Sequence, residues 1–241
     1  MLIRVCDFET TGIPCPEDKH AIVEAGWCDL LRDSGGSWRI TGPTAMLVNP
    51  GRDIPIEAMA IHHIRNADIE DAESPTESMR LLATGADVYC AHNIDFEKQF
   101  FGGGDKPWVC TYKSGLRLCP DAPRHTNQVL RYYLDLDSLP DFDPSLAQPP
   151  HRAGPDAYVT AHILRHFLDL TNFDDLVRWS SGPALLIRVG FGKHFNKKWA
   201  EVPVDYLQWI VGKSDISDRD VRATAKHHLK IAMARANSRA G

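Results

Sequence analysis

Two acidic residues near the start of the chain are the first candidates for chemistry. Asp7 and Glu9 stand two residues apart at the end of an apolar segment, residues 2–8, that is predicted to be a strand. Because side chains alternate between the faces of a strand, both carboxylates project from the same face, about 6–7 Å apart. Such like charges repel unless a cation lies between them, and Mg²⁺ or Mn²⁺ prefers carboxylate oxygens. The pair therefore predicts a metal site.

A second acidic cluster follows the predicted strand at residues 87–91. Asn93 is a typical helix N-cap residue, and Asp95 and Glu97 would then occupy the first helical turn. Carboxylates at that position also favour the helix dipole, so they do not by themselves indicate a metal site. Because Asp95 and Glu97 are about 200° apart around a helix, at most one of them can face a shared metal.

A third motif joins a proline-rich loop to an amphipathic helix predicted over residues 156–169. Asp156 begins this helix, and His151 lies five residues upstream in the loop. A histidine in such a loop is usually a surface residue. Beside an acidic metal site it could instead take a proton from water, since its ordinary pKa is about 6.5.

The elements that must position these residues alternate along the chain. Residues 2–8, 20–31 and 38–48 read as antiparallel strands, with a turn at residues 33–36, and further strands follow at 87–91 and 108–110. The predicted helices cover residues 55–64, 75–83, 93–101, 127–134 and 156–169, with another ending near residue 118. This order predicts an α/β fold in which helices flank a mixed sheet.

Composition limits the class of protein. The 241 residues, 43% hydrophobic and 24% charged, allow one domain or one domain with a small appendage. No stretch approaches the roughly 18 apolar residues of a membrane helix, and no export signal opens the chain, so we expect a cytoplasmic protein with no membrane partner. The six cysteines form no C-x-x-C pair. They therefore indicate neither a zinc knuckle nor a disulfide framework, and those in apolar runs are expected to be core residues.

The charge distribution suggests a boundary near residue 180. Residues 181–241 carry 11 Lys and Arg against 5 Asp and Glu, which leaves 16 against 27 for residues 1–180. An acidic body can collect metal, and a basic module can attract phosphate. In the module, aromatic residues alternate with Lys193, Lys197 and Lys198, as in surfaces that bind single-stranded nucleic acid. A small module also needs a core, so Trp199, Tyr206 and Trp209 are expected to be buried and the lysines to contact DNA.

Together the three acidic motifs resemble those of the DnaQ-like DEDDh exonucleases over roughly residues 1–170. The matching segments read DFETTG at 7–12, AHNIDFE at 91–97 and HRAGPD at 151–156. Residues 58–64 and 110–113 and the basic tail are most similar to the exodeoxyribonuclease X group of that family. The resemblance implies an RNase H-like mixed five-stranded sheet flanked by helices over residues 1–180, with a small C-terminal module at 181–241.

The resemblance also implies a mechanism and a substrate site. Two divalent ions, Mg²⁺ or Mn²⁺, would be held by Asp7, Glu9, Glu97 and Asp156, with His151 as general base, and nucleoside 5′-monophosphates would leave the 3′ end of DNA. The residues expected to bind the terminal nucleotide are Phe8, Thr10, Thr11, Gly12, Ile13, His63, Asn93 and Phe96. Core packing explains Phe96 equally well, and an exposed helix face explains His63 nearly as well.

The second motif departs from the family pattern. The family sequence reads H-N-x-x-F-D, and its final aspartate aligns with Glu97 of this chain. We therefore assign the role of metal ligand to Glu97 and keep Asp95 as the alternative. The extra methylene of glutamate would shift the carboxylate, and Mg²⁺ requires near-ideal octahedral geometry. Because of this departure, we expect a second ion held through water, or a preference for Mn²⁺.

Three functions remain open at the level of sequence. The first is an exonuclease for DNA 3′ ends, single-stranded or overhanging, that serves repair or end trimming. The second is the same enzyme acting on RNA ends. Contact with the 2′-hydroxyl would distinguish RNA from DNA, and no residue in the sequence indicates whether such a contact exists. The third is a nucleic-acid-binding protein that has lost catalysis. The sequence leaves the oligomeric state open, a dimer included.

Overall fold

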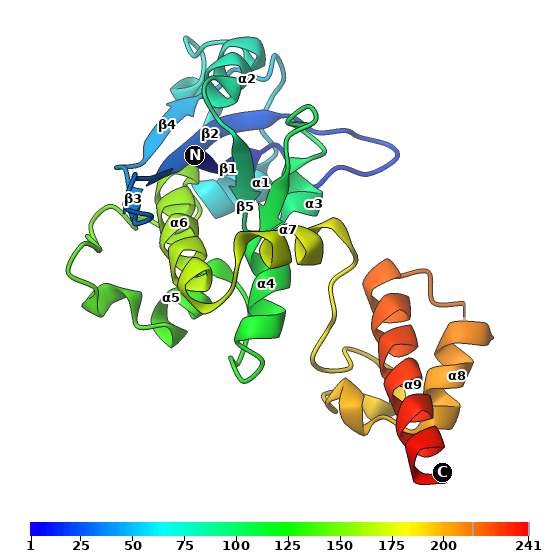
Figure 1. Cartoon of the computed structure of the whole chain (residues 1–241). Coiled ribbons are helices and arrows are strands. Elements are labelled where there is room, and N and C mark those ends of the chain that lie inside the picture. The colour runs from blue at the N-terminus through cyan, green and yellow to red at the C-terminus, as the bar shows by residue number, and fades with distance from the viewer. Residues whose placement is uncertain (214, 241) are drawn as a thin grey trace.

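The computed structural model describes residues 1–213 and 215–240. At its centre lies one mixed sheet with the strand order β3-β2-β1-β5-β6, in which β4 also pairs with β2 (Figure 1). The strands are β1 Leu2–Thr10, β2 Ile22–Arg32, β3 Trp38–Ile40, β4 Thr44–Leu47, β5 Val88–Ala91 and β6 Trp108–Cys110. Strands β1 to β4 pair antiparallel, whereas β5 is parallel to both β1 and β6. The predicted α/β class and mixed sheet are confirmed.

The sheet has six strands where five were predicted. The segment 38–48 forms two strands, because β3 pairs with one end of β2 and β4 pairs with the other. Gly42 and Pro43 lie between them, and proline has no N–H to donate to a β-ladder. The predicted turn at residues 33–36 is confirmed, and it is closed by a bond from the N–H of Gly36 to the carbonyl of Asp33.

Helices surround the sheet and continue into the C-terminal region (Figure 1). They are α1 Ile56–His62, α2 Pro75–Ala83, α3 Ile94–Glu97, α4 Thr111–Leu118, α5 Asn127–Tyr133, α6 Ala153–Leu170, α7 Phe173–Ser181, α8 Val204–Gly212 and α9 Arg219–Ala240, with 3-10 turns η1 Asn66–Asp68, η2 Leu136–Ser138, η3 Gly192–His194 and η4 Trp199–Glu201. Helix α3 is shorter than predicted, and α6 begins three residues earlier than predicted. Helix α7 was not predicted, although Asn172 caps it by accepting the N–H of Asp175.

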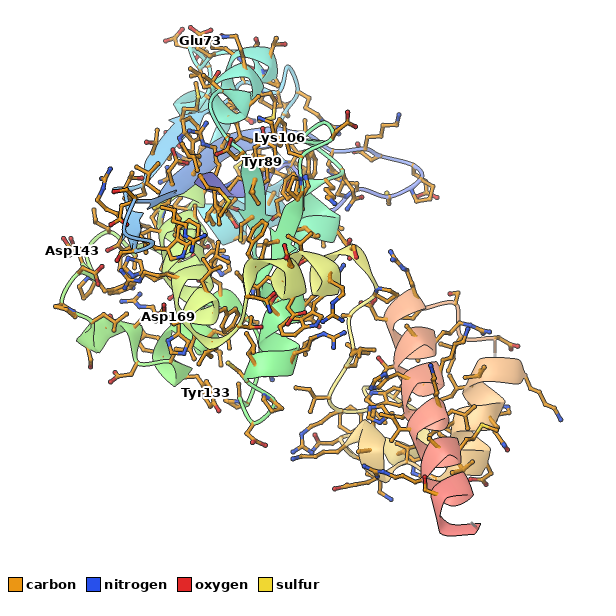
Figure 2. All side chains as sticks on the ribbon, viewed as in Figure 1. Glu73, Tyr89, Lys106, Tyr133, Asp143 and Asp169 are labelled. Atoms are coloured by element: carbon orange, nitrogen blue, oxygen red, sulfur yellow. The ribbon has the colours of Figure 1, made fainter. Side chains whose placement is uncertain are left out.

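The two faces of the sheet bury different side chains. Ile3 and Val5 of β1 pack with residues of α6, whereas Cys6 and Phe8 belong to a second cluster on the opposite face. Tyr89 of β5, labelled in Figure 2, is 1% exposed in that second cluster. Alternation along β1 therefore turns Asp7 and Glu9 toward the face that α6 covers. The cysteines of the apolar runs, Cys6, Cys28, Cys90 and Cys110, are buried as predicted.

Strand β2 and the first turn of α6 are in direct backbone contact at Gly26. A Cβ atom at Gly26 would lie 2.2 Å from the carbonyl carbon of Ala153 and 2.4 Å from the nitrogen of Gly154. Glu24, two residues earlier on the same face, accepts hydrogen bonds from the N–H of Ala153 at 2.8 Å and from Nε of Arg152 at 3.0 Å. The Glu24-x-Gly26 pattern thus fixes the start of α6 on the sheet.

The C-terminal region packs around its own cluster, which includes Val189, Trp199, Leu207 and Ile210. In Figure 1, α8 and α9 lie together, away from the sheet. Trp199 is buried as predicted, Tyr206 is half-buried, and Trp209 is 43% exposed. The prediction that Trp209 is buried is wrong, because its neighbours Leu207 and Ile210 take the inward face of α8. Among the described residues, no helix has both the length and the apolar character needed to span a membrane.

We expect Gly26→Ala to lower the free energy of unfolding by about 1–3 kcal/mol, because the added methyl group must displace the backbone of α6. Gly42→Ala is the matched control, since a Cβ at Gly42 meets nothing within 4 Å. Urea unfolding of both variants measures the difference. Equal midpoints for the two variants would show that β2 and α6 are not in this close contact.

Candidate active site

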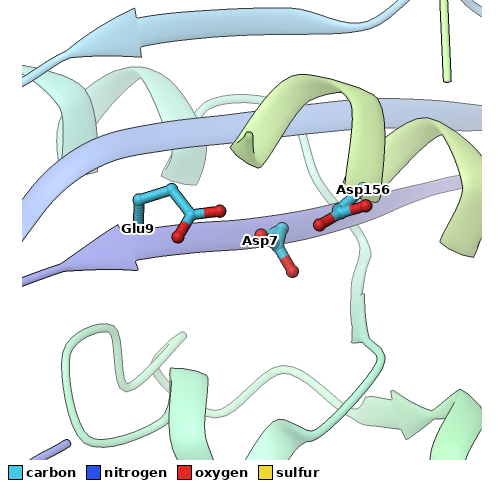
Figure 3. Close-up of side chains that lie close together, drawn as sticks. All are labelled: Asp7, Glu9 and Asp156. Atoms are coloured by element: carbon cyan, nitrogen blue, oxygen red, sulfur yellow. The ribbon is translucent and has the colours of Figure 1, made fainter. Parts of the chain in front are cut away.

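Three carboxylates meet where β1 ends beside the start of α6. One oxygen atom from each of Asp7, Glu9 and Asp156 lies within 4.8 Å of the other two. Figure 3 shows these three side chains close together. Asp7 and Glu9 come from the same face of β1, and Asp156 comes from the first turn of α6, which Gly26 and Glu24 hold in place. This group could hold a divalent metal ion.

A fourth carboxylate, Glu97 of α3, lines the same cavity. Glu97 is 4% exposed, and its Oε2 atom has no hydrogen-bond partner. Asp95 points elsewhere: it is exposed and pairs with Nζ of Lys113 at 2.7 Å. Because a buried carboxylate oxygen without a partner is costly, the donor set fits a cation at the cavity. The geometry favours Glu97 over Asp95.

Burial makes these carboxylates difficult to ionise without a cation. It raises the pKa of Asp7 well above its ordinary value, and the charges of Asp156 and Glu9 raise it further. Burial likewise raises the pKa of Glu9 to about 8 and that of Glu97 to about 8. It also raises the pKa of Asp156, against the opposing effect of hydrogen bonds from the His151 N–H and from Gln128. Full ionisation at neutral pH therefore requires bound positive charge.

His151 lies next to Asp156 and lines the same cavity as the four carboxylates. Its backbone has the left-handed conformation, with φ of 59°, and its N–H donates to Oδ2 of Asp156 at 3.0 Å. Its side chain is exposed and lines the cavity. The ring can therefore reach solvent and the acidic cluster together.

The cavity has a volume of about 600 Å³, and apolar residues line it together with the acids. Of the predicted substrate-binding residues, the structure places Phe8, Thr10, Thr11, Gly12, Ile13 and Phe96 in its lining. Ile13 is 77% exposed, so it forms part of the rim. A space of this kind can hold an apolar ring next to a charged group.

Two predicted substrate-binding residues do not line the cavity. Helix α1 ends at His62, so His63 takes the left-handed C-cap position with φ of 60° and its side chain is exposed. The buried neighbour His62 lines the cavity instead. Asn93 precedes α3 as predicted, but it is exposed and makes no side-chain cap bond.

Four further residues support the site and were not predicted. His20 lines the cavity, with Nδ1 3.2 Å from Oγ1 of Thr11, and no local pattern marks it. Gln128 donates to Oδ1 of Asp156 at 3.0 Å. Glu24 and Arg152 form the pair that fixes α6, and the Glu-x-Gly spacing on β2 was the available signal. The contacts of Gln128 with Asp156 and of Glu24 with Arg152 join segments far apart in the chain, so periodicity alone could not reveal them.

The metal-free protein should lose stability as pH rises from about 5 to about 8. Each raised pKa means that the folded chain keeps a proton that the unfolded chain has lost, so this contribution to stability disappears as pH passes the folded pKa. Asp7→Asn should raise the melting temperature in EDTA at pH 8, because it removes one buried charge. Asp71→Asn is the matched control and should leave the melting temperature unchanged, because Asp71 is exposed. Melting curves at both pH values measure this. A melting temperature in EDTA that rises over this range would contradict the account.

Two sequence comparisons relate the chain to known exonucleases. A family model described as an exonuclease, RNase T, matches residues 5–102. Exodeoxyribonuclease 10 of Escherichia coli strain K12 is 28% identical over 238 residues, which cover 95% of this chain and 99% of the relative.

Solved structures show the same fold. Exonuclease X in complex with 5′ overhanging duplex DNA has a TM-score of 0.58 and 26% identity, and the match covers 74% of this chain and 99% of that one. The nuclease domain of 3′hExo, a DEDDh family member bound to rAMP, has a TM-score of 0.52 and 18% identity, covering 70% of this chain and 92% of that one. The family uses divalent metal ions. The chain is therefore similar to exonucleases over almost its whole length, and its fold is that of DEDDh nuclease domains.

Proposed function

We propose that the substrate is DNA, degraded from single-stranded or overhanging 3′ ends with two Mg²⁺ or Mn²⁺ ions and released as nucleoside 5′-monophosphates. The observation that carries this proposal is the position of Asp7, Glu9 and Asp156 within 4.8 Å of one another in a cavity that also contains the unpartnered oxygen of Glu97. Four acids around one cavity are the donor set that hard divalent cations require.

In this proposal Asp7, Glu9, Glu97 and Asp156 hold the ions. When bound, the ions would neutralise charge on the scissile phosphate and make water a better nucleophile. The exposed ring of His151 accepts the proton of the attacking water. The bond from the His151 N–H to Asp156 keeps that ring next to the carboxylates. The Glu24–Arg152 pair positions both residues, because it anchors the turn that carries them.

The apolar residues that line the cavity would take the terminal nucleotide. Phe8, Ile13 and Phe96 offer contacts to a base or sugar, and they lie in the same cavity as the acids. Thr11 is 1% exposed, and its hydroxyl accepts the N–H of Ala21, which fixes the loop that leads to Ile13. Nucleotide binding would thus place the 3′-terminal phosphodiester beside the carboxylates.

DNA is favoured over RNA by the full-length relative. The Escherichia coli protein named as an exodeoxyribonuclease matches 95% of this chain, and the solved Exonuclease X holds duplex DNA. RNA is the second candidate, because the 3′hExo nuclease domain of the same fold was solved with rAMP. A binding protein without catalysis ranks last, since all four acids and His151 line the cavity.

We also infer that residues 181–241 form a separate small module and that the protein works in the cytoplasm. The module is supported by its own buried cluster around Trp199 and Leu207. A reducing compartment is supported by the cysteines, which are all free thiols.

Digestion of 5′-labelled DNA and RNA oligonucleotides with Mg²⁺, Mn²⁺ or EDTA tests the function. We expect metal-dependent shortening from the 3′ end, faster for DNA, with no activity in Asp7→Ala or Asp156→Ala. His151→Ala should lower turnover by roughly 10²–10⁴ while metal binding persists, because only proton transfer is removed. Full activity of Asp7→Ala would overturn the proposed site, and equal or faster digestion of RNA would reverse the substrate.

The same assay identifies the fourth carboxylate. Glu97→Gln keeps the shape of the side chain and removes its charge, so activity should fall as in the Asp7 variant. Asp95→Asn is the matched control and should retain most activity, since Asp95 is exposed and paired with Lys113. The reverse result would assign the role to Asp95.

A further inference from the structure

The basic C-terminal module exposes aromatic side chains that its own core does not use. Trp199 is 1% exposed and fills the cluster between α8 and α9. Trp209 and Phe195 are 43% and 70% exposed, respectively. A small module needs large side chains in its core, and this need accounts for the buried Trp199. It does not account for the exposed side chains of Trp209 and Phe195.

The exposed Trp209 belongs to a row of rings. The ring of Tyr206 stacks on Trp209 with centroids 5.3 Å apart, and the ring of His194 meets Tyr206 with centroids 4.5 Å apart. The close approach of Gly192 helps to fix this row, since a Cβ there would lie 3.0 Å from the hydroxyl of Tyr206. The row thus offers a preformed aromatic surface at Trp209, with Phe195 exposed next to His194 in the chain.

Positive charge borders the same row. Nζ of Lys193 lies 5.0 Å from the centroid of the Tyr206 ring. Burial lowers the pKa of His194, and the nearby charges of Lys193 and Lys197 lower it further, against the opposite effect of Asp205. Lys193 and Lys197 are both exposed. Rings next to lysines are suited to stacked bases joined by phosphates.

The charge of the whole chain indicates what this surface should bind. Residues 1–180 carry 16 Lys and Arg against 27 Asp and Glu, so the body repels a polyanion outside its metal site. Residues 181–241 carry 11 against 5 and supply the compensating attraction. An enzyme with an acidic body that acts on DNA needs such a cationic contact.

We propose that the surface formed by His194, Tyr206, Trp209, Phe195, Lys193 and Lys197 binds a single-stranded segment of the substrate outside the active-site cavity. The inference rests on the proposed function, because the occupant is the same nucleic acid. Bases would stack on Trp209 and Phe195, and the lysines would pair with phosphates. Long substrates would then be held at two places and short ones only at the cavity.

The test compares kcat/KM of the full-length enzyme on dT30 and dT4 with Mg²⁺ at several salt concentrations. Trp209→Ala with Phe195→Ala should lower kcat/KM on dT30 by roughly tenfold or more and leave dT4 unchanged. Lys193→Gln with Lys197→Gln should reduce the salt dependence on dT30, by about 0.7 in the logarithmic slope for each phosphate that is no longer neutralised. Tyr132→Ala and Arg39→Gln, exposed residues of the body, are the matched controls.

The outcomes separate the two proposals. If the wild-type enzyme releases no mononucleotides from either substrate, the proposed function fails. If it is active but the module variants behave like the controls on dT30, or lose activity equally on dT4, the surface does not bind the strand and the inference is overturned. Melting temperatures show whether the variants fold. If the Trp209→Ala, Phe195→Ala variant does not fold, the salt dependence of the Lys193→Gln, Lys197→Gln variant tests the proposal by itself.

Discussion

The structure depends on one electrostatic constraint, which is that four carboxylates share one cavity. Asp7, Glu9 and Asp156 approach within 4.8 Å of one another, and Glu97 is 4% exposed at the same cavity. Burial is the main reason that the pKa values of Glu9 and of Glu97 rise to about 8. The rest of the fold must hold these groups together against their repulsion, and a cation is what relieves it.

The fold meets this constraint through the contact between β1, β2 and α6. Alternation along β1 sends Ile3 and Val5 into the core that α6 covers, so Asp7 and Glu9 must face the same helix. Gly26 allows α6 to approach β2 closely enough for Asp156 to reach them. Glu24 then holds the first turn of α6 through Ala153 and Arg152. Stability and the site therefore share one set of contacts.

The sequence was sufficient wherever local pattern determines position. Period-two alternation placed Asp7 and Glu9 on one face, and the order of elements predicted the mixed sheet. Contacts between distant segments could not be read in this way. Examples are the choice between Glu97 and Asp95, which depends on which side chain is buried, and the pairing of Glu24 with Arg152, 128 residues away. His63 and Trp209 were misplaced because a one-residue shift at a helix end or on a helix face reverses exposure.

Proton release on metal binding tests the central claim most directly. Titration of MnCl₂ into the protein at pH 7, by calorimetry in buffers of different ionisation enthalpy, counts the protons displaced. Because Glu9 and Glu97 have pKa values of about 8 without metal, we predict release of about one to two protons on binding. A binding enthalpy that does not depend on the buffer would mean that the carboxylates are already ionised, and would contradict the account.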